Sequence, residues 1–206
     1  MHCELKFVPL HSISSMTRYE IIHPDEFSEQ RLEEIFAQLP EWRKAEAQRF
    51  KFRQGQVECA LSYWLLSQMA GFQPDFIKGE HGKPTSQQPQ FHFNLSHCKQ
   101  AVACAISDES EVGIDVESLG RYKPSLAEYC MNDEELKQIA ESDDMDATFT
   151  LLWTKKEALL KLTGEGITDD LKNCLLSERM KGVTFESGVN KERGYAWSLV
   201  YSVHSS

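Results

Sequence analysis

Two acidic residues after a short apolar run are the first candidates for chemistry in this sequence. Asp115 and Glu117 are two positions apart, so on a strand both side chains would project from one face. Their neighbours Ile114 and Val116 would then face the opposite, apolar side. Adjacent carboxylates repel each other unless a cation lies between them, and hard divalent ions such as Mg²⁺ prefer oxygen ligands. The alternative is a solvated strand end in an acidic protein.

A segment further along the chain, residues 147 to 163, has the pattern of a helix with one apolar stripe. Lys156 falls inside the stripe, where a lysine is costly unless its ammonium reaches a partner or a cleft. Glu157 and Lys161 are neighbours on the flank of the stripe, and by themselves they could be a surface ion pair. A phosphate-handling site accounts for all three, with Glu157 as a further Mg²⁺ ligand and the lysines neutralising phosphate oxygens. The apolar stripe consists of Phe149, Leu152, Trp153 and Leu160.

Further basic groups could complete an anion pocket. Lys83 precedes Pro84 on a predicted turn, and Ser96 and His97 end a predicted strand. A lone histidine also fits a hydrogen-bonded structural role. The remaining candidates lie on a predicted helix, of which they could equally form the solvated face. They are Arg49, Lys51 and Arg53.

The elements that must position these residues alternate along the chain. Helical patterns come first, strand patterns follow, and the same order then repeats. This order predicts an α/β (α+β) fold of two similar halves, residues 1–100 and 101–206. We expect residues 101–106 and 112–116 to pair as an antiparallel hairpin. Helix ends are predicted from their capping residues, which are Ser28, Gly71, Asn132 with Glu135, Asp146 and Gly164.

Charge and composition exclude several classes of protein. The 206 residues contain 22 Lys plus Arg and 32 Asp plus Glu, a net charge of −10. A protein that binds nucleic acid through phosphates needs a basic surface, so we expect no nucleic-acid partner. We find no signal-peptide pattern and no apolar run near the roughly 18 residues of a membrane span. The scattered cysteines fit buried thiols in a reducing compartment, so we expect a cytoplasmic protein.

The order of four segments resembles the 4′-phosphopantetheinyl transferases, in particular the larger type that activates surfactin synthetase. The most specific part is the pair of motifs G-[IV]-D-x-E and W-[ST]-x-K-E-[AS]-x-x-K. The segments are GKP at 82–84, FNLSH at 93–97, VGIDVE at 112–117 and LWTKKEALLK at 152–161.

The resemblance implies a fold, a reaction and two ligands. Two α/β halves would be related by pseudo-twofold symmetry, with coenzyme A in the cleft between them. A serine hydroxyl of an apo acyl- or peptidyl-carrier protein would attack the β-phosphorus of coenzyme A. Phosphopantetheine would move to the serine and 3′,5′-ADP would leave. The metal would be Mg²⁺, with Mn²⁺ as an alternative ion, and a cleft within one chain predicts a monomer.

The resemblance also assigns roles to residues around the metal. Asp115, Glu117 and Glu157 match the acidic residues that hold Mg²⁺. Glu157 is also the candidate general base for the serine proton, and the two roles compete. Lys161 matches the lysine that touches the pyrophosphate.

Other matched positions are implied to contact coenzyme A. Lys83, with Pro84, and His97 match positions near the 3′-phosphate, and Ser96 matches a further contact. Lys156 matches a lysine on the coenzyme A side. The helix after Arg49 departs from the family pattern, which is like D-R-x-R: Gln or Gly replaces the acid, and Glu58 or Cys59 replaces the downstream arginine. We expect Arg49 or Arg53 to supply the missing phosphate contact.

Two other functions remain open from the sequence. An Asp followed later by Glu and Lys also serves Mg²⁺-dependent nucleases, although the net charge argues against one. A non-catalytic protein that binds coenzyme A or a carrier is the other alternative. The carrier would be recognised largely by apolar residues, because carriers are typically acidic, as this chain is. The candidates for that surface are Tyr122, Leu126, Tyr129 and Met131.

Overall fold

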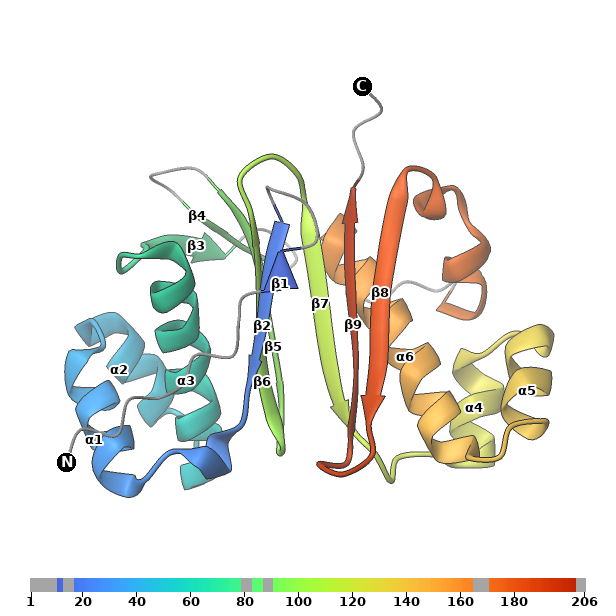
Figure 1. Ribbon diagram of the computed structural model, residues 1–206, viewed down its shortest axis with the longest axis horizontal. Coiled ribbons are helices and arrows are strands. Elements are labelled where there is room, and N and C mark those ends of the chain that lie inside the picture. Colours follow the sequence, from blue (N-terminus) through green and yellow to red (C-terminus); the bar gives the residue numbers. More distant parts are fainter. Residues whose placement is uncertain (1–10, 13–16, 79–82, 87–90, 165–170, 203–206) are drawn as a thin grey trace.

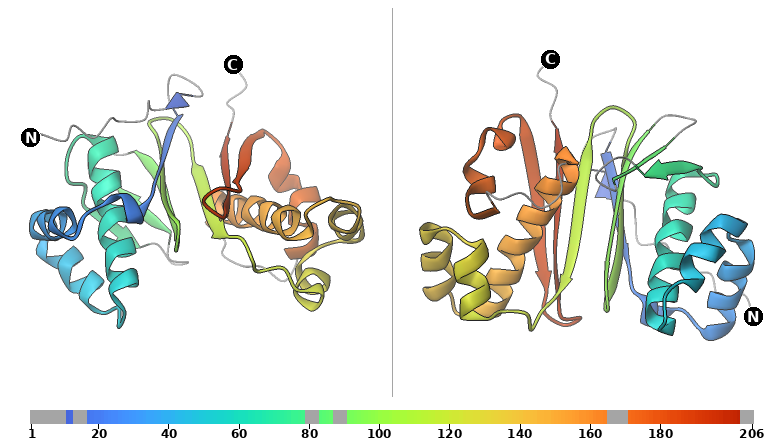
Figure 2. Two further views of the ribbon diagram at one scale, coloured as in Figure 1. Left: turned by 60° about the horizontal axis from the view of Figure 1, so that its bottom comes forward. Right: turned by 180° about the vertical axis from the view of Figure 1, so that it is seen from behind.

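Two antiparallel sheets lie next to each other in the middle of the molecule, each with helices on its outer side (Figure 1). The structure is a computed structural model, and it describes residues 11–12, 17–78, 83–86, 91–164 and 171–202. Helices α1 to α3 lie outside the first sheet and helices α4 to α6 outside the second, as the two further views in Figure 2 also show. The mixed α/β class predicted from the sequence is therefore confirmed.

Each sheet is built from strands that are distant in the sequence. The first sheet has the order β1-β2-β6-β5, the second has the order β7-β9-β8, and β3 pairs with β4. The strands are β1 (His11–Ser12), β2 (Thr17–Ile22), β3 (Phe76–Lys78), β4 (Pro84–Ser86), β5 (His92–Cys98), β6 (Ala101–Ser107), β7 (Val112–Ser118), β8 (Val183–Asn190) and β9 (Tyr195–Ser202). The α-helices are α1 (Glu29–Gln38), α2 (Glu41–Gln48), α3 (Arg53–Ala70), α4 (Pro124–Cys130), α5 (Asp133–Ala140) and α6 (Met145–Thr163), and the 3₁₀ helices are η1 (Pro24–Glu26), η2 (Leu171–Leu176) and η3 (Glu178–Met180).

The two halves share one chain path. In the first, β2 leads through helices to the hairpin β5–β6, and β2 pairs with β6. In the second, β7 leads through helices to the hairpin β8–β9, and β7 pairs with β9. Two similar halves were expected. The expected boundary at residues 100 and 101, however, falls inside the β5–β6 hairpin, and the first sheet continues to Ser107.

The predicted hairpin between residues 101–106 and 112–116 is wrong. β6 lies between β2 and β5 in the first sheet, whereas β7 is an edge strand of the second sheet. The reason is that β6 is buried at every position, so it needs a neighbouring strand on both sides. Cys98 of β5 and Ala101 of β6 pair across a turn of two residues, so β5 is the strand nearest to β6 along the chain.

Most helix ends follow the expected local chemistry. The Ser28 side chain accepts from the Arg31 N–H, and Asn132 and Glu135 form a capping box. Gly71 and Gly164 end α3 and α6 in the left-handed conformation. Asp146 does not cap α6.

Asp144 is the N-cap of α6, and Asp146 has another role. Asp144 accepts from the Ala147 N–H at 3.0 Å. Asp146 instead accepts from the N–H groups of Gly120 and Tyr122, at 2.6 Å and 2.9 Å. It therefore ties the loop after β7 to the start of α6.

The core has one layer on each side of each sheet. α1 and α3 pack on the outer face of the first sheet, and α6 packs on the second. Small and aliphatic side chains fill the space between the sheets, among them Ala103, Ala105, Ile114 and Val116. The cysteines that the structure describes are buried, which agrees with the expectation for thiols. No helix of the described residues is long and apolar enough to cross a membrane.

Candidate functional site

Strands β5 and β7 are joined through side chains where the two sheets meet. Asn94 Oδ1 accepts from the Ile114 N–H at 2.9 Å, and Ser96 Oγ accepts from the Val116 N–H at 3.2 Å. These side chains satisfy backbone donors on the edge of β7 that no strand covers. The contact holds Ser96 of the first half next to Asp115 of the second half.

A row of side chains on α6 runs along the acidic face of β7. Four residues along a helix span about 6 Å, and two residues along a strand span nearly the same distance. Trp153, Glu157 and Lys161 therefore stay in step with Glu117 and Asp115. The period-2 and period-3.6 patterns together bring the predicted acids to one place. We call Asp115, Glu117 and Glu157 the carboxylate cluster.

Close packing at Gly113 allows this approach. A Cβ atom built on Gly113 would lie 2.1 Å from Ala158 O and 2.8 Å from Leu162 N. Both are backbone atoms of α6, so they cannot move aside as a flexible side chain would. Glycine at this position lets α6 lie directly on β7.

Asp115 is the most buried acid of the cluster, with 3% of its surface exposed. Its Oδ1 accepts from Lys161 Nζ at 2.6 Å and from Ser96 Oγ at 2.8 Å. Its Oδ2 is buried and has no partner in the described part of the chain. A buried carboxylate oxygen without a donor is costly, which points to a ligand.

Glu157 faces Asp115 from α6. Its Oε1 is also buried and has no partner within the residues described. Burial, followed by the nearby charge of Asp115, raises the pKa of Glu157 above its ordinary value, although Lys161 acts in the opposite direction. The cluster therefore holds more negative charge than its own cations offset.

Glu117 is held by two groups that no sequence pattern indicated, Arg121 and Trp153. Arg121 pairs with its Oε2, and Trp153 Nε1 donates to its Oε1 at 3.3 Å. Arg121 is half exposed, so it can turn away from Glu117 into solvent. Glu117 is thus at the open side of the cluster.

The donor set fits a hard divalent ion. Asp115 Oδ2 and Glu157 Oε1 have no hydrogen-bond partner among the described residues, so both can serve as metal ligands. Glu117 can join them when Arg121 releases it. In the structure as described, no group of three or more His, Cys, Asp or Glu is already arranged around a metal position. Glu117 pairs with Arg121, and Asp115 pairs with Lys161.

Lys161 and Ser96 lie at the cluster, as expected, but the hydroxyl of Ser96 has no capacity left for a ligand. It donates to Asp115 and accepts from Lys161 Nζ, at 2.9 Å, and from the Val116 N–H. A hydroxyl has one hydrogen and two lone pairs, so all are in use. The Ser96 side chain joins the two halves and does not reach outward.

Lys156 is placed differently from the expectation of a coenzyme A contact. It is fully buried on the other side of α6, where Nζ pairs with Glu135 Oε2 at 2.8 Å. The carbonyl oxygens of Leu171 and Lys172 accept its other hydrogens at 3.0 Å and 2.9 Å. The apolar stripe that contains Lys156 faces α4 and α5, not β7. Its partners explain why a lysine is tolerated there.

Lys83 lies at the far end of α6, where its ammonium pairs with Glu111 and donates to Leu162 O at 2.7 Å. His92 Nδ1 contacts the other Glu111 oxygen at 2.9 Å. Burial by itself would raise the pKa of Glu111, but Lys83 and His92 outweigh burial and lower it. Pro84 follows Lys83 on β4, opposite Lys78. Glu111 therefore offsets the charge of Lys83.

The first-half candidates are separated. His97 points to α3, where its Nδ1 lies 3.3 Å from Glu58 Oε2. Arg53 turns to α1, pairs with Glu29 at 3.0 Å and stacks on Phe36. Arg49 is exposed at the end of α2. None of these three basic residues contacts the carboxylate cluster in the described structure.

Part of this chain is similar to known proteins. Residues 111–204 match the model of the 4′-phosphopantetheinyl transferase superfamily. The chain is 38% identical over 96 residues to the 4′-phosphopantetheinyl transferase psf-1 of Bacillus pumilus, covering 45% of this chain and 41% of that protein. It is 36% identical over 110 residues to the 4′-phosphopantetheinyl transferase AcpT of Salmonella typhimurium, which covers 48% of this chain and 55% of that protein. It is 32% identical over 96 residues to the 4′-phosphopantetheinyl transferase Sfp of Bacillus subtilis, which covers 45% of this chain and 42% of that protein.

This chain is thus similar to the 4′-phosphopantetheinyl transferases over residues 111–204. The matched part of the chain spans about half or less of these curated relatives. The carboxylate cluster, Lys161 and Arg121 all lie within the residues that match the superfamily model.

Sequence reasoning assigned no site role to Arg121, Trp153 or Glu58. Trp153 packs with the apolar stripe, as predicted, and its four-residue spacing from Glu157 also brings its Nε1 to Glu117. Arg121 follows Glu117 by four residues in a loop, where no periodic pattern indicates its direction. Glu58 replaces a basic residue of the family pattern, and no local pattern indicates that it lies beside His97.

The proposed carrier surface is only partly exposed. Tyr129 is 75% exposed, and Tyr122 and Leu126 are partly buried against the α4–α6 core. Met131 is fully buried, so it cannot contact a partner directly. Its burial follows from its place at the C-terminal end of α4, against α5 and α6.

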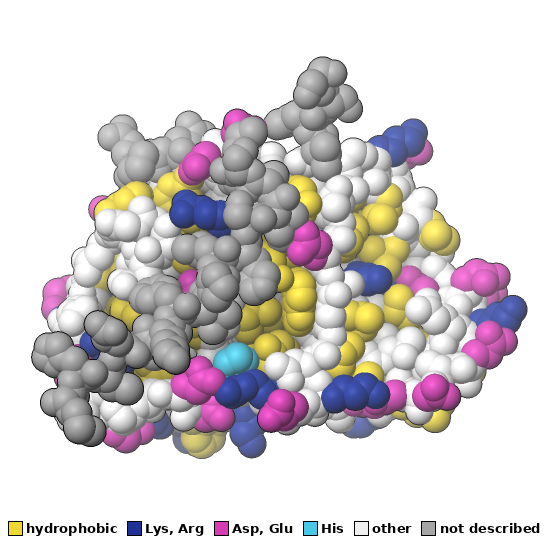
Figure 3. All heavy atoms as spheres, in the orientation of Figure 1, with side chains coloured by type: hydrophobic (Ala, Val, Ile, Leu, Met, Phe, Trp, Pro, Cys, Tyr) yellow, Lys and Arg dark blue, Asp and Glu magenta, His cyan; other side chains and the backbone are white. Residues whose placement is uncertain are grey.

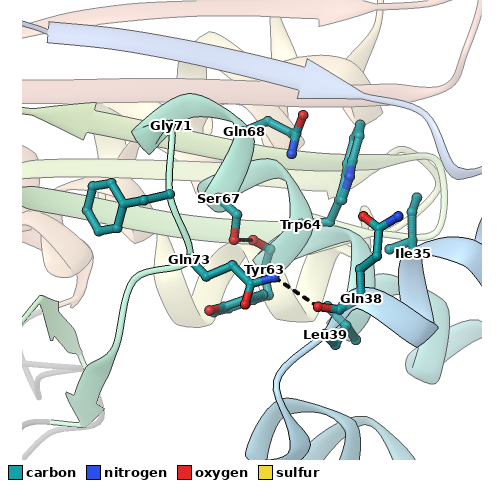
Figure 4. Close-up of a pocket in the computed structure, with 10 residues that line it drawn as sticks. Ile35, Gln38, Leu39, Tyr63, Trp64, Ser67, Gln68, Gly71 and Gln73 are labelled. Atoms are coloured by element: carbon teal, nitrogen blue, oxygen red, sulfur yellow. Dashed lines mark hydrogen bonds between the residues drawn. The ribbon is translucent and has the colours of Figure 1, made fainter.

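A separate pocket of about 260 Å³ lies between α1 and α3 (Figure 4). It carries no Lys, Arg, Asp or Glu, and Gln73 Nε2 donates to Gln38 O at its rim. A diphosphate would find no countercharge there. On the face shown in Figure 3, basic and acidic side chains are intermixed and form no continuous basic surface. The carboxylate cluster remains the candidate for phosphate chemistry.

Proposed function

We propose that this protein transfers the 4′-phosphopantetheine group from coenzyme A to a serine of an apo acyl- or peptidyl-carrier protein. The observation that carries the proposal is the pair of buried, unpartnered oxygens of Asp115 and Glu157, next to Lys161. They lie in the segment that matches the superfamily model, and the relatives are named 4′-phosphopantetheinyl transferases. Coenzyme A and Mg²⁺ enter as the substrate and ion of that reaction, with Mn²⁺ as an alternative ion.

Asp115, Glu117 and Glu157 would hold the metal. The ion would supply positive charge that offsets the charge developing on the leaving phosphate. Lys161 already lies beside Asp115, so it adds positive charge at the same place. Arg121 would release Glu117 and become available to an anionic substrate.

Glu157 would accept the proton of the attacking serine, directly or through water. Burial raises the pKa of Glu157 in the metal-free protein, which favours proton acceptance, whereas holding the metal competes with that role. The serine oxygen forms a bond to the β-phosphorus of coenzyme A, and the bond to the bridging oxygen breaks. 3′,5′-ADP leaves with that oxygen, and the proton stays on Glu157 or passes to water.

Incubation of the purified protein with coenzyme A, MgCl₂ and a panel of apo carriers tests the proposal. Mass spectrometry should show the gain of one phosphopantetheine group on the carrier serine. Asp115→Ala should abolish the gain. Asp108→Ala, which removes an exposed acid from the β6–β7 turn, should leave it unchanged. No gain on any acyl or peptidyl carrier would overturn the proposal.

The same samples separate the other functions. Metal-dependent cutting of plasmid DNA would support a nuclease, and calorimetric binding of coenzyme A without transfer would support a binding protein. EDTA should stop transfer, and MgCl₂ or MnCl₂ should restore it, since the carboxylate cluster binds hard divalent ions.

We further propose that the carrier docks beside the loop after β7 through Tyr129 and Leu126. Tyr129 is an exposed aromatic side chain on α4, and apolar contact suits an acidic partner of a chain with net charge −10. Tyr129→Ala should raise the KM for the carrier and leave the KM for coenzyme A unchanged. An unchanged carrier KM would contradict this surface. We also propose a cytoplasmic monomer.

A further inference from the structure

A buried glutamate on α3 lies next to a histidine at the end of β5. Glu58 is 8% exposed and lies on the side of α3 that faces the first sheet. Its Oε2 lies 3.3 Å from His97 Nδ1, and its Oε1 accepts from Gln54 Nε2 at 2.8 Å. Among the residues described, no lysine or arginine pairs with Glu58. Its only cationic partner there is a histidine.

This arrangement is not explained by stability. Burying a carboxylate is costly, and a glutamine or an apolar residue would fill the site at lower cost. Burial by itself would raise the pKa of Glu58, but the hydrogen bonds from His97 and Gln54 outweigh burial and hold that pKa below its ordinary value. Glu58 therefore carries a charge at neutral pH.

The charge determines the hydrogen position on His97. An ionised carboxylate only accepts hydrogen bonds, so Nδ1 must carry the hydrogen that points to Glu58. Nε2, on the other side of the ring, has no partner in the described structure, and the side chain is 41% exposed. Nε2 is thus presented outward. When it binds a phosphate it becomes protonated, and Glu58 stabilises the resulting imidazolium.

The alternation of β5 separates this histidine from its neighbour. Ser96 faces β7, where its hydroxyl is fully used, and His97 faces α3. His97 is therefore the member of this pair with a free polar group for an outside ligand.

We propose that Glu58 is a positioning residue, which fixes the His97 ring so that Nε2 receives a phosphate group of coenzyme A. This inference rests on the proposed function. It assigns a role to a carboxylate outside the carboxylate cluster and outside the region that matches the superfamily model. Glu58 acts through His97 and does not touch the substrate itself.

Nitrogen-15 NMR of the His97 ring tests the positioning without any substrate. In the wild-type protein the neutral ring should carry its hydrogen on Nδ1, whereas free histidine prefers Nε2. Glu58→Ala should return the ring to the Nε2–H form. Glu34→Gln, on the exposed face of α1, is the control for the loss of one negative charge and should change nothing. An Nε2–H ring in the wild type, or no change in Glu58→Ala, would overturn the inference.

Kinetics separates positioning from a structural role. Glu58→Gln should raise the KM for coenzyme A about tenfold, the size expected for one charge-assisted hydrogen bond, and leave kcat within about twofold. In a His97→Ala background the same substitution should add less than about twofold, because its effect passes through the ring. Additive effects would overturn the inference, as would an unchanged KM.

The two proposals can fail separately. If the wild-type protein transfers phosphopantetheine and Glu58→Gln behaves like it, only the role of Glu58 is wrong. If the wild-type protein transfers nothing and binds no 3′,5′-ADP by calorimetry, the proposed function is wrong. The ring tautomer then still decides whether Glu58 positions His97.

Discussion

The buried pair of Lys156 and Glu135 leads to a quantitative prediction. Lys156 is completely buried, and its Nζ is saturated by Glu135 and by the carbonyl oxygens of Leu171 and Lys172. Glu135→Gln keeps an oxygen that can accept from Lys156 but removes the only carboxylate paired with it in the described structure. The ammonium is then buried without countercharge.

The expected loss is about 3 kcal/mol in the free energy of unfolding. Breaking a buried pair by removing one partner costs about 3–5 kcal/mol, and the retained hydrogen bond favours the low end. The unfolding entropy of a chain of 206 residues turns about 3 kcal/mol into a fall of about 7 °C in Tm. Circular dichroism during heating and urea titration measure both quantities.

Two matched variants make the result specific. Glu178→Gln breaks an exposed pair with Lys181 and should cost less than about 0.5 kcal/mol. The double variant Lys156→Met with Glu135→Gln should be more stable than Glu135→Gln alone, because no unpaired charge remains. The reasoning is refuted if Glu135→Gln loses less than about 1 kcal/mol, or if the double variant gains nothing over it. Lys156→Met should also leave the KM for coenzyme A unchanged, since its ammonium does not face the carboxylate cluster.

Three further outcomes follow from the site. Gly113→Ala should cost about 1–3 kcal/mol and lower kcat, because the new methyl group pushes α6 away from β7; unchanged Tm and kcat would contradict the close packing. In the metal-free protein, Glu157→Gln should raise Tm at neutral pH but not near about pH 4. The folded state holds the Glu157 proton more tightly than the unfolded state does. The protonated side chain therefore contributes its full stability below the unfolded-state pKa, and this contribution is lost as pH rises through the raised folded-state pKa. A Tm difference that does not depend on pH would contradict this. Trp153→Phe removes the donor to Glu117 and should lower the apparent affinity for Mg²⁺ about tenfold, measured by titration of transfer activity; an unchanged affinity would show that the contact has no effect.

The spacing of the acidic site could be predicted because it depends on local periodicity. Asp115 and Glu117 share a face through the period of a strand, and Glu157 and Lys161 share a face through the period of a helix. Capping chemistry is equally local, so the ends of α3 and α5 followed from Gly71 and from Asn132. These features need only the residues within one or two turns.

Strand pairing and the partners of buried charges could not be predicted in the same way. β6 and β7 are adjacent in the sequence and both apolar, yet they lie in different sheets, because β6 pairs with β2 and β5 whereas β7 pairs with the distant β9. The direction of Lys156 depended on Glu135 and on two carbonyl groups, none of which its own helix indicates.

The sequence by itself determined which acids and lysines share a face, since the regular backbone repeats of helix and strand impose that spacing. Only the tertiary structure decided that the Ser96 hydroxyl bonds to Asp115 of the other half, that Lys156 pairs with the buried Glu135, and that Glu58 lies beside His97. The physical reason is that a hydrogen bond or ion pair is set by distance in space. Those distances exist only after α6 lies on β7 and β5 meets β7.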